Sequence, residues 1–166
     1  NMVLSGREAF SSIMYDGVIP YSALLKNDDI VFVRSNGSKS LVGRSVLVRD
    51  IDFDLTYSGF CIRFRKQRVD FDSKFILYAM WSNKFREVID SYTRGTNITN
   101  VSQDMLKNVL LPEISLHKQL EIVKKLDVVC AEIDNSLLEK NTQRDILCEY
   151  KKSLIYEYVT GKKEVI

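Results

Sequence analysis

Three short stretches in the first part of the chain have the apolar patterns of β-strands. Residues 29–34 form a mainly apolar run before a Ser-Asn-Gly-Ser turn, which predicts a buried strand, and residues 45–48 predict a second one. Residues 60–65 alternate strictly, as a half-buried strand with a basic outer face does. The residues expected to face the core are Phe60, Ile62 and Phe64. Those expected to face outward are Cys61, Arg63 and Arg65.

Residues 72–92 have apolar positions at helical spacing. Asp72 or Ser73 can begin the helix, because short polar side chains accept hydrogen bonds from the free N–H groups of a first turn. The residues that define the apolar face are Phe75, Ala79, Phe85 and Ile89. Strands and helix together predict an α+β fold, a small mixed α/β domain, for this part of the chain.

Residues 116–159 contain neither proline nor glycine, and their apolar residues recur at steps of three and four. The pattern predicts one continuous helix, which Gly161 ends as a C-cap glycine does. At ~1.5 Å per residue its length is roughly 65 Å, more than the small preceding region can cover, so the apolar stripe needs a partner. The residues assigned to this helix interface are Val123, Leu126, Cys130, Ile133, Leu137, Leu147, Leu154 and Tyr158.

Basic residues interrupt the apolar stripe at Lys140, Arg144 and Lys151. Polar positions inside a helix seam can fix the register of a coiled coil, so we expect a mixed interface and not a simple two-stranded zipper. The periodicity changes near Pro112. We therefore expect residues 1–112 to form a domain and residues 113–166 to form a long coiled-coil-forming helix.

Composition excludes several classes of protein. Of the 166 residues 45% are hydrophobic and 28% charged, which is enough apolar content for a core. His117 is the only histidine and the three cysteines are widely spaced, which excludes a histidine-based zinc motif or a metal knuckle. No stretch of about twenty apolar residues exists to span a bilayer. We expect a cytoplasmic protein with no membrane association and no cofactor.

The net charge of +2 conceals a local concentration of positive charge. Basic residues clearly outnumber acidic ones between Arg34 and Arg68. Arginine and lysine can neutralise phosphates, while hydroxyl and amide side chains can read base edges, although many charged surfaces are merely solvated. The candidate DNA-binding residues are Arg34, Ser38, Lys39, Arg44, Arg63, Arg65, Tyr92, Arg94, Thr96 and Asn97.

A second chemistry is suggested by Asp54, Asp72 and Lys74, which resemble in outline the Asp…Asp-x-Lys arrangement of metal-dependent nucleases. The pattern is short and common. Asp72 also lies where a helix cap is expected, and capping is the favoured interpretation. The cysteines and Trp81 are more typical of packing than of catalysis or base stacking.

Three segments carry a resemblance to a known family. Residues 109–126 read VLLPEISLHKQLEIVKKL, residues 154–162 end in Thr-Gly-Lys, and residues 27–34 with 41–44 form a strand-turn-strand ending in Gly-Arg. The first resembles the junction at which a target recognition domain passes into a long helix in DNA-specificity subunits of type I restriction–modification systems. The second is similar to the end of that helix, and the third to the domain's "Gly-Asp-Ile, Arg, Gly" segment.

The resemblance implies a non-catalytic module that recognises double-stranded DNA. In that family a subunit carries two recognition domains and two helices that pack antiparallel, each domain reads half of a split target, and separate methyltransferase and restriction subunits perform catalysis. The helix here is then expected to pair with a second spacer helix, from the same subunit or in a homodimer. We expect residues 1–112 to be a recognition domain without its N-terminal part.

Two alternatives from other classes stay open at this point. The first is a coiled-coil interaction protein that does not bind DNA. The second is the metal-dependent nuclease using Asp54, Asp72 and Lys74.

Overall fold

A computed structural model describes residues 2–11, 17–93, 99–103, 106 and 109–164 of the chain. Contacts divide the chain into two compact units, Asn1–Val123 and Lys124–Ile166. The described strands and helices are β1 (Val3–Ser5), η1 (Arg7–Ala9), η2 (Tyr21–Ala23), β2 (Ile30–Val33), β3 (Ser35–Asn36), β4 (Ser45–Arg49), β5 (Cys61–Phe64), α1 (Ser73–Met80), α2 (Asn83–Thr93), β6 (Thr99–Asn100) and α4 (Leu116–Val159). This arrangement confirms the predicted α+β class with one long helix.

The first unit is built on a sheet whose described strands have the order β1-β4-β2-β5. The three strands predicted from the apolar patterns are present as β2, β4 and β5, and β2 pairs antiparallel with both neighbours. Phe32 lies opposite Ser45 on one side and Ile62 on the other. Directly opposed residues share a face, so this register directs one apolar set toward the helices.

The inward orientation predicted for Phe60 is wrong. Its side chain is 68% exposed, because β5 begins at Cys61 and Phe60 belongs to the preceding turn. There its backbone N–H donates to Ser58 Oγ, and its carbonyl accepts from the N–H groups of Arg34 and Ser35. Ile62 is buried and Phe64 packs against the core, as predicted.

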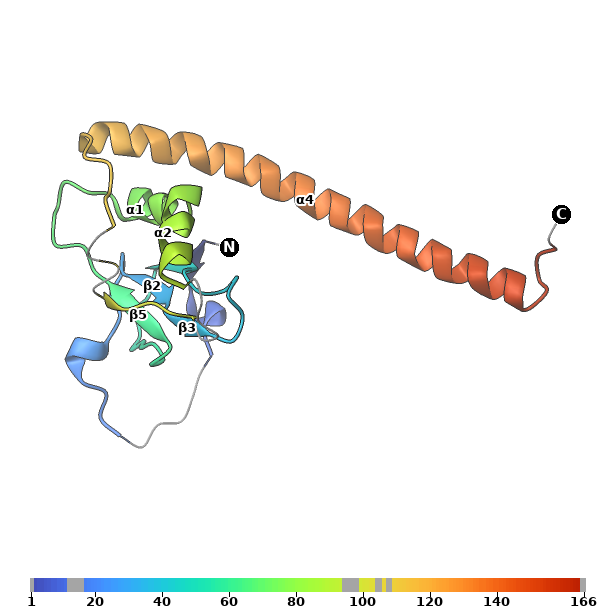
Figure 1. Cartoon of the computed structure of the whole chain (residues 1–166), viewed down its shortest axis with the longest axis horizontal. Coiled ribbons are helices and arrows are strands. Elements are labelled where there is room, and N and C mark those ends of the chain that lie inside the picture. The colour runs from blue at the N-terminus through green and yellow to red at the C-terminus, as the bar shows by residue number, and fades with distance from the viewer. Residues whose placement is uncertain (1, 12–16, 94–98, 104–105, 107–108, 165–166) are drawn as a thin grey trace. The chain divides into compact units, whose positions relative to one another are not determined.

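Two helices, α1 and α2, replace the single helix predicted over residues 72–92 and lie on one side of the sheet (Figure 1). Asp72 caps α1 as expected, accepting a hydrogen bond from the Phe75 N–H at 2.8 Å. The break occurs at Ser82, whose hydroxyl donates to the Ala79 carbonyl and accepts from the Phe85 N–H. Serine thus competes with the helix backbone for its own hydrogen bonds and starts a new helix.

The core lies between the sheet and these helices. Ile30, Phe32 and Leu47 from the sheet and Leu77 from α1 are at most 1% exposed. Phe32 meets Phe85 edge to face, with 5.8 Å between ring centres. Burial of each such side chain contributes ~1.5–3 kcal/mol, so this cluster gives the first unit a hydrophobic core of its own.

A tight corner precedes β2. Asp28 has a positive φ of 71°, which a residue with a Cβ rarely adopts. Asp29 is 1% exposed and accepts from the Lys26 N–H at 2.8 Å, and its two carboxylate oxygens accept from Nε and Nη2 of Arg65, each at 2.6 Å. The segment identified as similar to "Gly-Asp-Ile" is therefore a structural corner with Asp28 at the glycine position.

The long helix α4 spans Leu116–Val159, the range predicted from periodicity. Gly161 follows with a φ of 71°, and its N–H donates to the Tyr158 carbonyl at 3.2 Å, as in a glycine C-cap. The first turns of α4 belong to the first unit, which extends past Pro112 because Gln119 and Val123 are buried there.

Gln119 fastens the start of α4 to the first unit. Its side-chain N–H groups donate to the carbonyls of Asp70 and Ile114 at 3.0 and 2.9 Å. Its amide oxygen accepts from the Asp72 N–H at 2.9 Å, and the residue is fully buried. One glutamine thus satisfies three backbone groups in the segments around the helix start.

Candidate nucleic-acid interface

A small second sheet brings two polar segments together. Strand β3 pairs antiparallel with β6, so that Ser35 lies opposite Asn100 and Asn36 opposite Thr99. The Arg34 carbonyl next to it accepts from the Val101 N–H at 2.8 Å. The pairing therefore brings residues 35–36, which follow β2, beside residues 99–100, which follow the polar segment after α2. Both regions were proposed from the sequence to approach DNA.

The turn between β3 and β4 is organised by polar side chains. Asn36 accepts from the Ser38 N–H, the hydroxyls of Ser38 and Ser40 are 2.9 Å apart, and Arg44 Nε donates to the Ser40 carbonyl at 3.2 Å. Arg34 Nε donates to Asn100 Oδ1, also at 3.2 Å. Four polar side chains with exposed donors or acceptors thus follow one continuous turn.

Helix α2 holds this turn in place. Arg86 donates to the carbonyls of Val42 and Lys39 at 2.6 and 3.0 Å, and its charge is balanced by Asp90 at 2.7 Å. Gly43 has a φ of 90°, and a Cβ there would approach Ile89 at 3.4 Å. Glycine is required by the backbone conformation, and the close approach to α2 adds to that requirement.

Arg63 and Arg65 point away from the predicted core face but bind protein atoms. Arg63 donates to the Ser22 and Leu24 carbonyls, and Arg65 binds Asp29. The hydrogen bonds that Arg65 donates to Asp29 raise the pKa of Arg65, while burial acts in the opposite direction. Their assignment as DNA contacts stays a prediction, and the geometry gives both arginines partners within the fold.

The structure does not describe the side chains of four of the candidate DNA-binding residues. Arg94, Thr96 and Asn97 lie outside the described residues, and Tyr92 lies in α2 with its side chain outside the description. Sequence reasoning missed Asn36 and Asn100, which the β3–β6 pairing places beside the turn. Periodicity could not have identified these residues, because a two-residue strand is too short to show an alternating pattern. Only the polar composition of each stretch could have pointed to them.

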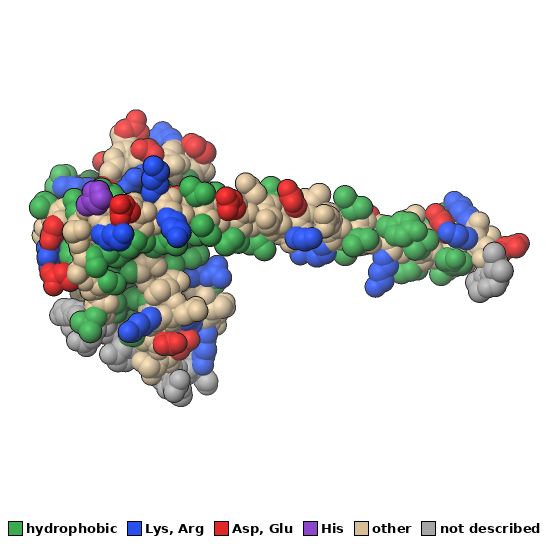
Figure 2. Space-filling view, turned by 90° about the horizontal axis from the view of Figure 1, so that it is seen from above, with side chains coloured by type: hydrophobic (Ala, Val, Ile, Leu, Met, Phe, Trp, Pro, Cys, Tyr) green, Lys and Arg blue, Asp and Glu red, His purple; other side chains and the backbone are tan. Residues whose placement is uncertain are grey.

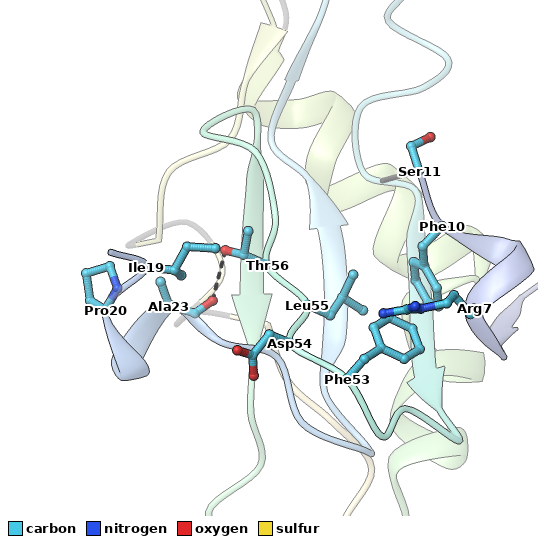
Figure 3. Close-up of a pocket in the computed structure, with 10 residues that line it drawn as sticks. All are labelled: Arg7, Phe10, Ser11, Ile19, Pro20, Ala23, Phe53, Asp54, Leu55 and Thr56. Atoms are coloured by element: carbon cyan, nitrogen blue, oxygen red, sulfur yellow. Dashed lines mark hydrogen bonds between the residues drawn. The ribbon is translucent and has the colours of Figure 1, made fainter. Parts of the chain in front are cut away.

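A cavity of about 540 Å³ lies between η1, η2 and the segment after β4 (Figure 3). Asp54 lines it, together with Arg7, whose guanidinium lies 5.1 Å from the centre of the Phe53 ring. Asp72, the second acid of the nuclease pattern, caps α1. In the part of the chain that the structure describes, no three His, Cys, Asp or Glu residues are grouped to hold a metal ion.

The second unit exposes large apolar side chains among charged ones along α4 (Figure 2). Ile133, Leu137 and Leu147 are 53%, 55% and 65% exposed. Leu126, Cys130 and Leu154 are half-buried, and Tyr158 is exposed. Val123 differs, because it is buried in the core of the first unit and is covered within the chain. Among the described helices, none is long and apolar enough to cross a membrane.

Comparison with known proteins finds similarity to specificity subunits of type I restriction enzymes. The chain is 29% identical over 145 residues to the EcoKI specificity subunit of Escherichia coli K12 and 28% identical over 144 residues to the StySPI specificity subunit of Salmonella potsdam. Each match covers 87% of this chain and 31% of the relative. The MjaVIII specificity subunit of Methanocaldococcus jannaschii is 25% identical over 95% of the chain, which spans 36% of that protein. No protein-family profile matches the chain.

Proposed function

We propose that the chain is a DNA-recognition domain with its spacer helix, acting as a specificity component of a type I restriction–modification complex. The observation that carries the proposal is the extent of the match, 87% of the chain against relatives named as specificity subunits. That length includes both the polar turns of the first unit and most of the long helix. The module itself recognises DNA, and methyltransferase and restriction subunits supply methylation and cleavage.

The first unit contacts DNA through the turn that begins at Arg34. Lys39 and Arg44 lie there with no acidic partner in the described structure, so their charges are available to phosphates. Ser38 has a hydroxyl, and Asn36 and Asn100 have amides, that suit base edges. Tyr92, Arg94, Thr96 and Asn97 complete the predicted contact set from the segment leading to β6.

The second unit pairs with another helix of the same kind. Lys140, Arg144 and Lys151 occupy seam positions in its later half, whereas Asp127 and Asp134 flank the seam in its earlier half. Two copies side by side in parallel would place like charges together. In an antiparallel pair Asp127 and Asp134 of one copy meet the basic seam residues of the other, so these residues favour antiparallel pairing.

The DNA-recognition proposal is tested in the complex assembled with its methyltransferase subunit. Methylation mapping of the source genome, with the gene present and deleted, first identifies the target. We expect Arg34→Ala, with its Asn100 contact removed, to weaken binding to a duplex carrying that target. Lys125→Ala is the control, because it removes one positive charge from the second unit. If the gene's deletion leaves every methylation site intact, the chain does not specify DNA.

Helix pairing between copies is tested with the native cysteines in a Cys61→Ser background. Cys130 and Cys148 are about five turns of ~3.6 residues apart and so share one face of α4. In an antiparallel pair centred between them, Cys130 of each copy meets Cys148 of the other. We expect mild oxidation to give a disulfide-linked dimer that either single Cys→Ser change abolishes. A dimer that persists with one remaining cysteine would indicate parallel pairing.

A further inference from the structure

A second, smaller cavity of about 260 Å³ lies between the turn that ends at Arg44 and the junction of α1 and α2. One side of it is polar, with Ser40 and Arg44 from the turn. The other side is largely apolar, with Met80 and Trp81 from the end of α1. A cavity with one cationic side and one apolar side suits a ligand that itself has an anionic and an apolar part.

Arg44 supplies a cation that has no acidic partner among the described residues. Its Nε donates to the Ser40 carbonyl, which orients the guanidinium, and no acidic partner is present within the described part of the chain. Arg86, the other arginine of the cavity, is paired with Asp90 and donates to two carbonyls of the turn. Arg86 is therefore a positioning residue, and Arg44 is the group that can bind an anion.

The serine pair beside Arg44 can donate one further hydrogen bond. The Ser38 and Ser40 hydroxyls are 2.9 Å apart, so one donates to the other and the second keeps its proton. Ser40 lines the cavity, and Ser38 leads through its N–H to Asn36 at the candidate DNA interface. The cavity thus adjoins the proposed interface directly.

Trp81 forms the apolar side in a fixed orientation. Its indole Nε1 donates to the Ser45 carbonyl at 2.8 Å, while the side chain remains 48% exposed. Met80, which also lines the cavity, is 8% exposed. An aromatic ring that is held at one edge and about half exposed is a suitable platform for a sugar ring.

We propose that this cavity binds one sugar–phosphate unit of the DNA backbone, with the phosphate on Arg44 and a serine hydroxyl and the deoxyribose against Trp81. The inference rests on the proposed function, since it names a backbone contact of the same recognition domain. The contact is independent of base sequence. It fixes the position of the turn on the duplex while neighbouring side chains approach bases.

The test measures how salt affects binding of the assembled complex to the mapped target duplex and to a duplex of scrambled sequence. We expect Arg44→Ala to weaken both by about tenfold, the order of a charge-assisted hydrogen bond. The slope of log affinity against log salt should fall by ~0.9, and Arg44→Lys should restore it. Arg49→Ala is the matched control, because the Arg49 charge is already paired with Asp28 at 3.2 Å.

A neutral methylphosphonate placed at successive positions of the target duplex locates the contact. We expect one position to weaken binding by the wild-type complex and to have no effect on Arg44→Ala. Trp81→Ala should also weaken binding to the duplex, because it removes the ring against which the deoxyribose is proposed to lie. Trp81→Phe keeps an aromatic ring and should bind like the wild type. An unchanged salt slope, or a loss confined to the mapped target, would overturn the phosphate assignment while leaving DNA recognition in place. A wild-type complex that binds neither duplex would overturn both proposals.

Discussion

The two units of the chain differ in the range of their polar contacts and in the burial of their apolar side chains. In the first unit, contacts link residues far apart in sequence, as in Arg65 with Asp29 and Gln119 with Asp70. In the second unit, hydrogen bonds such as those of Ser136 with Glu132 and Ser153 with Glu157 join residues four positions apart, and Ile133 and Leu137 remain exposed. A helix with only local bonds gains little stability from itself. The first unit therefore has a core of its own, and we expect the second to be stabilised by a partner helix.

Removal of the buried carboxylate of Asp29 should strongly destabilise the first unit. Asp29→Ala leaves the Lys26 N–H and the Arg65 guanidinium without their acceptor. Because the Arg65 side chain is 31% exposed and can regain water, we expect the lower end of the cost of breaking a buried pair, about 3 kcal/mol. Urea unfolding followed by Trp81 fluorescence measures this loss.

Asp52→Ala is the control for that change, since Asp52 is an exposed acid near the corner. It should unfold like the wild type. If the Asp29→Ala and Asp52→Ala variants are equally stable, the long-range polar contacts of Asp29 do not stabilise the first unit, and this difference between the two units disappears.

Gln119→Ala should produce the second largest effect, at the joint between the fold and the helix. The change leaves one N–H and two carbonyls without partners, at Asp72, Asp70 and Ile114. Water can reach some of these groups after the truncation, so we expect a loss of about 2 kcal/mol in urea unfolding. Lys118→Ala, at the exposed neighbouring position, should change stability by less than ~0.5 kcal/mol.

Strong periodicity explains what the sequence alone predicted well. The range of α4, the cap at Asp72 and the strands β2, β4 and β5 all follow from local spacing and were confirmed. Phe60 was placed wrongly because the alternation continues into a turn that pairing excludes from β5. The break at Ser82 was missed because its hydroxyl competes for helix hydrogen bonds without interrupting the apolar spacing.

The candidate interface was only partly predictable. The basic character of the turn near Arg34 and Arg44 is visible in the sequence. The β3–β6 pairing that joins it to Asn100 is not, because each strand has two residues and the pairing is long-range. Internal partners of Arg63 and Arg65 were also hidden, since composition does not distinguish an arginine that binds backbone carbonyls from one that is free in solvent.

A charge placed in the helix seam should affect the second unit alone. Leu137→Asp puts a carboxylate where an apolar side chain is expected to meet a partner helix, and we expect the pairing free energy to fall by about 2 kcal/mol. Sedimentation velocity measures pairing, and urea unfolding should show an unchanged first unit. Glu139→Asp on the same helix is the control. A loss of stability in the first unit would show that the two units are not independent.

The smallest expected effect is at Asp28, where backbone strain and a surface ion pair oppose each other. Asp28 has a φ of 71°, which glycine adopts without strain, so Asp28→Gly should relieve strain of about 1 kcal/mol. The change also removes the pair with Arg49, whose partners are 40% and 46% exposed and which contributes ~0–1 kcal/mol. We expect a net gain of about 0.5 kcal/mol in the urea unfolding of the first unit, with helix pairing unchanged. Asp28→Ala loses the ion pair and keeps the strain, so it should be the least stable of the three. If the glycine variant is instead less stable than the wild type but more stable than the alanine variant, the ion pair outweighs the backbone strain, and the corner before β2 depends on its charges.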